Sequence, residues 1–161
     1  MYVVAVRLAA ILTGFSISFG GGLDVAKLKK GVVAIAEKDY PTTAIKDPVC
    51  PKKIKKSKGL VSQCTILLNG KTLTYNITQT DGKGNVDILP VEAVISVHKA
   101  VDFLESTLKK ARNEVVSVDC GKDDVIIAKP GTVVTCQAET PSQKGPVKFR
   151  VSDINGNVKV V

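Results

Sequence analysis

The residues of this chain whose type and spacing most directly imply chemistry are its four cysteines, Cys50, Cys64, Cys120 and Cys136. No two of them lie close enough for the C-x-x-C spacing of a zinc knuckle or a redox motif. Three interpretations are open at this point: two disulfides, a four-cysteine zinc site with widely spaced ligands, or four buried free thiols in a cytosolic protein.

His98 is the single histidine of the chain, which limits any catalysis or metal binding that depends on histidine. A general base needs an oriented partner, and Glu105, two helical turns further on, is a candidate. No nucleophile accompanies the pair, and the chain contains no phosphate loop, dinucleotide fingerprint or nucleophile elbow. We therefore interpret His98 as a residue at the edge of a helix's apolar face, and we expect no enzymatic activity and no cofactor.

Two further groups partly resemble known sites. Asp119, Asp123 and Asp124 lack the glycine-centred acidic pattern of a calcium loop, so we predict a turn there and no metal site. Asn76-Ile77-Thr78 matches a glycosylation sequon, but it falls in a predicted strand.

The charge of the chain is strongly basic and unevenly distributed. Its formal net charge of +8 favours anionic partners in general. Five lysines occupy seven positions between the first two cysteines: Lys52, Lys53, Lys55, Lys56 and Lys58. Held in a disulfide loop, they are the candidate residues for binding phospholipid headgroups, an acidic polymer or nucleic acid. The counterpart between the other cysteines carries Asp123 and Asp124, so a solvated loop without a partner is the alternative.

The N-terminal segment, residues 1–22, has the composition of an export signal. Residues 8–15 have the length of a signal peptide's apolar region, and Arg7 supplies the preceding positive charge. The same arginine disfavours a stable transmembrane helix. We predict a signal peptide or membrane-anchor segment over residues 1–22, with an N-terminal helix or strand of the domain as the alternative.

The chain repeats itself, in a first unit of residues 23–89 and a second of residues 90–161. Matching positions recur in order at an offset that grows from 69 in the helix to 70 and then 72: Val25 and Val94, Cys50 and Cys120, Cys64 and Cys136, Gly84 and Gly156. The repeat selects the pairings Cys50–Cys64 and Cys120–Cys136 from the three that four cysteines allow. Each bridge contributes roughly 3 kcal/mol, and such bridges indicate an oxidising compartment.

Each unit is predicted to open with a helix and continue as strands. The second helix has an apolar stripe at helical spacing, with Pro90 in its first turn: Val94, Val97, Val101, Leu104, Leu108 and Ala111. Alternating residues then predict half-buried strands around Leu73-x-Tyr75-x-Ile77 and Val147-x-Phe149-x-Val151. The predicted fold class is α+β: two tandem repeats, each with one helix packed on a small antiparallel sheet of about four strands.

The cysteine blocks resemble an actinobacterial cell-envelope family of unknown function, present as two tandem copies. The first copy carries Val49-Cys50-Pro51, Gly59, Cys64, Tyr75-x-Ile77 and Gly84-Asn85-Val86, and the second carries Val118-Asp119-Cys120, Gly131, Cys136 and Phe149-x-Val151. The second copy departs from the pattern at Gly121, where proline is usual. The resemblance implies a location in the envelope and implies no enzymatic activity.

The favoured hypothesis is therefore a non-enzymatic, exported or cell-envelope protein that binds an envelope protein, an anionic polymer or a membrane surface. One alternative is a carrier of a small apolar ligand or lipid between helix and sheet. The other is a basic protein that binds nucleic acid, for which few arginines and aromatic side chains are present.

Overall fold

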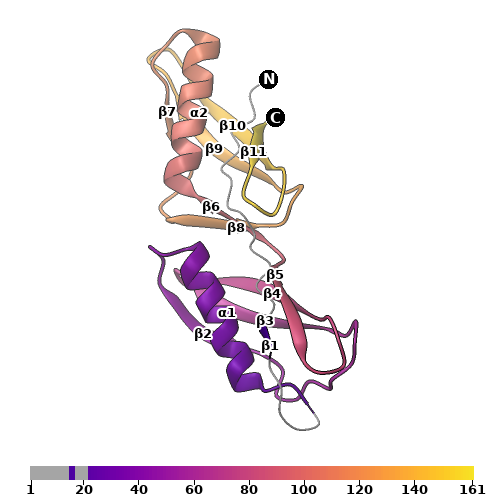
Figure 1. The fold of residues 1–161 in the computed structure, drawn as a ribbon. Helices are drawn as coiled ribbons and strands as arrows, with labels where there is room; N and C mark the ends of the chain where they lie inside the picture. Colours follow the sequence, from indigo (N-terminus) through magenta and orange to yellow (C-terminus); the bar gives the residue numbers. More distant parts are fainter. Residues whose placement is uncertain (1–14, 17–21) are drawn as a thin grey trace. The chain divides into compact units, whose positions relative to one another are not determined.

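The structure is a computed structural model that describes residues 15–16 and 22–161. Within the described residues, the chain divides after Val91 into two compact units. Each unit combines one helix with antiparallel strands, and strand residues outnumber helical ones (Figure 1). The fold is therefore mixed α+β, as predicted.

Helix α1 (Val25–Asp39) belongs to the first unit. Its N-cap is Asp24, whose carboxylate accepts a hydrogen bond from the Lys27 N–H at 3.1 Å. The helix buries Leu28, Val32 and Ala36, which recur at a spacing of four and form one face.

Helix α2 (Val97–Arg112) belongs to the second unit and begins later than the sequence pattern predicted. Its N-cap is Ser96, whose hydroxyl accepts from the Lys99 N–H at 3.4 Å. Val94 lies instead in strand β6 (Ala93–Ser96), and Pro90 ends strand β5 (Asn85–Pro90). The two helices thus begin 72 residues apart, and the predicted offset of 69 is wrong for them.

The sheet of the first unit has the order β1-β5-β4-β3-β2. Its strands are β1 (Phe15–Ser16), β2 (Ile45–Val49), β3 (Val61–Leu68), β4 (Lys71–Gln79) and β5. The inward positions of β4, Leu73, Tyr75 and Ile77, are fully buried, which confirms the predicted alternation. Asn69 and Gly70 join β3 to β4 with φ angles of 49° and 79°, the backbone conformation that an Asn-Gly hairpin turn requires.

The second unit holds a four-stranded sheet of order β11-β10-β9-β7 and a separate pair, β6 with β8. Its further strands are β7 (Ser117–Asp119), β8 (Val125–Ala128), β9 (Val133–Glu139), β10 (Lys144–Val151) and β11 (Val158–Val160). Ala100 and Leu104 of α2 share one buried cluster with Cys136 of β9 and with Phe149 and Val151 of β10.

Most of the predicted signal or anchor segment, residues 1–22, lies outside the described residues. Of its described positions, Phe15 pairs with Val86 and Ser16 with Asn85, while Gly22 forms a bridge with Lys55. No helix in the described part of the chain is long and apolar enough to cross a membrane.

Candidate functional site

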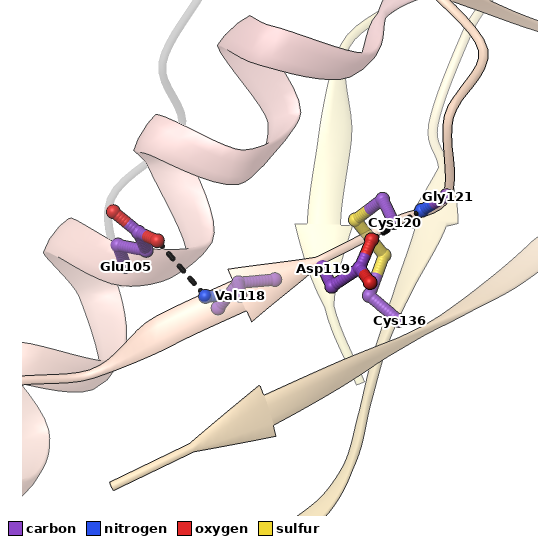
Figure 2. Close-up of a disulfide and its surroundings, with 6 residues drawn as sticks. All are labelled: Glu105, Val118, Asp119, Cys120, Gly121 and Cys136. Carbon is purple, nitrogen blue, oxygen red and sulfur yellow. Dashed lines mark hydrogen bonds between the residues drawn. A yellow bond between two sulfur atoms is a disulfide. The ribbon is translucent and has the colours of Figure 1, made fainter.

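Both predicted disulfides are present, Cys50–Cys64 and Cys120–Cys136. In each unit the first cysteine directly follows an edge strand, and the second lies in the neighbouring strand; Figure 2 shows the bridge of the second unit. The Cα atoms are 4.3 Å apart in the first bridge and 4.4 Å in the second. All four sulfurs are therefore paired, which excludes both the zinc site and the free thiols.

The five predicted lysines lie in the loop of residues 51–60, which we call the lysine loop. Lys52, Lys53, Lys55 and Lys58 are exposed and Lys56 is half-buried. None of the five forms a salt bridge with another described residue. Their charges are thus available to an external anion.

Main-chain contacts hold the lysine loop at several points between the disulfide and β3. Ile54 is buried, and its carbonyl accepts from the Leu23 N–H at 2.9 Å. Gly59 has a φ of 79°, which favours glycine, and its N–H donates to the Gln79 carbonyl at 2.7 Å. Every lysine therefore lies within two residues of Cys50, Ile54 or Gly59.

The side chain of Gln79 fixes the middle of the same loop. Gln79 is 1 % exposed. Its Oε1 accepts from the Ser57 N–H at 2.9 Å, and its Nε2 donates to the Lys55 carbonyl at 2.7 Å. A buried amide that satisfies both of its polar ends on one loop restricts the conformations of that loop. The lysines are consequently presented from a restrained backbone.

Exposed apolar side chains lie at the two ends of the lysine loop or directly beside them in the chain. Val49 precedes the first cysteine, while Leu60 and Val61 follow the last lysine, and their exposed fractions are 59 %, 39 % and 53 %. Lysines accompanied by exposed apolar side chains are the composition found where proteins contact lipid headgroups.

The candidate catalytic pair is not formed. His98 is 85 % exposed and its Nε2 lies 3.5 Å from Asp102, not from Glu105. Glu105 instead accepts a hydrogen bond from the Val118 N–H at 2.9 Å, which joins α2 to β7 (Figure 2). A solvated His–Asp contact one helical turn apart is a surface feature, and this arrangement contains no oriented base.

The acidic group and the sequon also take structural roles. Asp119 accepts from the Gly121 N–H at 2.8 Å, which makes the predicted turn (Figure 2). Neither Asp119, Asp123 nor Asp124 belongs to a metal-ligand cluster among the described residues. Asn76 lies within β4, as predicted, where its side-chain oxygen accepts from Gln63 at 3.0 Å.

Gln79 is the site residue that the sequence pattern failed to identify. It occupies the fourth inward position of β4, after Leu73, Tyr75 and Ile77, where an apolar residue is expected. A polar side chain at an inward strand position was the available signal, since such a group must find partners. Its partners lie more than 20 positions away in the sequence, so only the structure identifies them.

Comparison with protein-family models, curated proteins and solved structures finds no match to this chain. The resemblance to an envelope family remains a prediction.

Proposed function

We propose that this chain is a non-enzymatic, exported binding module that docks on an anionic membrane surface through its lysine loop. The observation that carries the proposal is the combination of four exposed lysines, which form no salt bridge within the described part of the chain, with a loop backbone held by Ile54, Gly59 and Gln79. Restraint of the loop before binding lowers the conformational entropy that binding must remove. The flanking Val49, Leu60 and Val61 favour a lipid surface over a soluble acidic polymer.

Export is supported by the two disulfides, which suggest an oxidising, extracellular type of environment. The proposal places the protein at the cell envelope or in the secreted fraction. It agrees with the predicted signal or anchor segment and with the resemblance to an envelope family.

We further infer that the two units are copies of one α+β unit in which the helix packs on the sheet. Matching hydrogen bonds 72 residues apart support this inference. Gly59 N–H donates to the Gln79 carbonyl and Gly131 N–H to the Val151 carbonyl, both at 2.7 Å. The carboxylates of Asp81 and Asp153 each accept from the backbone and side chain of the asparagine four positions later.

Vesicle co-sedimentation at several salt concentrations tests the docking proposal. The full chain is compared on vesicles that contain phosphatidylglycerol and on vesicles of phosphatidylcholine alone. The test variant replaces four loop lysines: Lys52→Gln, Lys53→Gln, Lys55→Gln and Lys58→Gln. Each lysine at an anionic surface contributes roughly 1 kcal/mol, so we expect a loss of roughly several hundredfold on the anionic vesicles.

A matched control removes the same net charge elsewhere. Its four substitutions are at exposed lysines outside the loop: Lys109→Gln, Lys110→Gln, Lys148→Gln and Lys159→Gln. We expect this variant to lose less than about tenfold in affinity, because only long-range attraction is reduced. Equal losses in the two variants would overturn the loop as the site. Tighter binding to duplex DNA than to anionic vesicles, lost in the loop variant, would favour the nucleic-acid alternative.

A further inference from the structure

A pocket of about 290 Å³ lies in the second unit between the last turn of α2 and the hairpin of β9 and β10. Its lining combines the polar residues Thr140 and Gln143 with five apolar ones: Leu108, Val116, Ala138, Pro146 and Val147. Arg112, the last residue of α2, also borders it. Arg112 is exposed and forms no salt bridge with a described residue.

The pocket lies where the paired strands carry small side chains. Gly145 of β10 stands opposite Ala138 of β9 in the strand register. A Cβ atom added to Gly145 would meet no heavy atom within 4 Å, so the space beside this glycine is open. The pocket therefore exists in part because the cross-strand pair Gly145 and Ala138 carries only one methyl group.

The first unit fills the matching space with its own side chains. The cross-strand pair 72 residues earlier is Leu73 opposite Ile66, and both are essentially fully buried. Tyr75, which matches Val147 in register, is also completely buried. One framework thus closes this space with large side chains in one unit and leaves it open in the other. The pocket is open to solvent, so an apolar occupant would remove its apolar walls from water, which favours binding.

We propose that this pocket binds a small apolar monocarboxylate, of about the size of a phenylpropanoic acid. The volume lies at the lower end of ligand pockets, which start at about 300 Å³, so the body of the ligand is small. The apolar lining favours a hydrocarbon or aromatic body. Arg112 is the lining cation without an acidic partner, whereas Lys144 is paired with Glu139 at 3.3 Å. A single planar guanidinium matches a single carboxylate.

NMR titration of the full chain with 3-phenylpropanoate tests the proposal, with the uncharged 3-phenylpropanamide as the matched ligand. We expect saturable shifts at the backbone amides of Leu108, Gly145 and Val147. Arg112→Gln should weaken binding of the acid by about tenfold and leave that of the amide nearly unchanged. Lys110→Gln, in the same turn of α2 but outside the pocket lining, is the control and should bind the acid as the unmodified chain does.

Gly145→Leu fills the pocket with the residue that the first unit carries at the matching position. The open space beside Gly145 accepts this side chain, so the variant should fold and melt at an equal or higher temperature. It should also lose the titration shifts for both ligands. The proposal is overturned if neither ligand binds at millimolar concentration, if Gly145→Leu binds as before, or if acid and amide bind equally well. Binding of a protein partner through an aromatic side chain, with no small-ligand binding, would also overturn it.

Discussion

Gln79 offers the sharpest test of how the lysine loop is held, through the substitution Gln79→Val. The matching inward position in β10 of the second unit is Val151, which is completely buried. Valine is therefore compatible with this position of the framework, and the substitution introduces no clash. What it removes is the pair of side-chain hydrogen bonds to Ser57 and Lys55, at 2.9 and 2.7 Å.

The magnitude follows from those two hydrogen bonds. Each hydrogen bond contributes about 0.5–1.5 kcal/mol net to stability. The net value is small because, once the bond is lost, the loop N–H and carbonyl groups form hydrogen bonds with water instead. We therefore expect Gln79→Val to lower the free energy of unfolding by about 1–3 kcal/mol. Vesicle binding should weaken as well, because the lysines would be ordered only on binding.

Urea denaturation measures the change in stability, and amide hydrogen exchange locates it. The Ser57 N–H should exchange faster in the variant, because its acceptor is the lost side chain. The Gly59 N–H is the internal control, since it donates to the main-chain carbonyl of Gln79, which the substitution retains. An unchanged denaturation midpoint together with unchanged exchange at Ser57 would refute the role of this side chain in holding the loop.

Three further changes have defined outcomes. Tyr75→Phe removes a buried hydroxyl that has no hydrogen-bond partner among the described residues, so stability should stay unchanged or rise by about 1 kcal/mol; a loss of that size in urea denaturation would contradict the assigned environment. Replacing Cys120 and Cys136 together by serine should lower stability by roughly 3 kcal/mol, and a loss below about 1 kcal/mol would show that closing this loop adds little. Hydrogen bonds, first of all from the Asn85 N–H, hold the pKa of Asp81 below its usual range. The resulting stabilisation is present above the ordinary aspartate pKa and is lost as pH falls through the lower folded-state value; a carboxyl NMR titration with an ordinary or raised midpoint would refute this.

The sequence predicts the strands and disulfides well because both depend on local, periodic signals. Alternation along β4 identifies its buried face, and the recurrence of the cysteine blocks selects the pairing that the structure forms. The start of α2 was misplaced because Val94 and Val97 fit helical spacing over a short run. In the structure, Val94 pairs with Ile127 as part of strand β6. Ser96 is the N-cap of α2, so the helix begins only after it.

The candidate sites are less accessible to sequence reasoning because they depend on long-range neighbours. The run of lysines can be recognised in the sequence. The hydrogen bonds that hold its backbone come from Gln79, which lies more than 20 residues later, at the end of β4. The pocket has no sequence motif, because it arises from absent volume. Nothing in the sequence distinguishes Gly145 from other glycines; the strand register, which places it opposite Ala138, is known only from the structure.

The two units differ at the positions that serve the proposed sites. At the fourth inward position of the long strand, the first unit places Gln79, which binds the lysine loop, and the second places Val151, which fills its core. At the matching cross-strand pairs the relation is reversed, because Leu73 and Ile66 close the core of the first unit while Gly145 and Ala138 leave a pocket in the second. Gly145 has room for a side chain, but open space is not by itself evidence of a function, because natural proteins commonly retain positions where a filling substitution would add stability. The two proposals therefore concern different units and fail separately: the loop-lysine variant tests surface docking by the first unit, and Gly145→Leu tests ligand binding by the second.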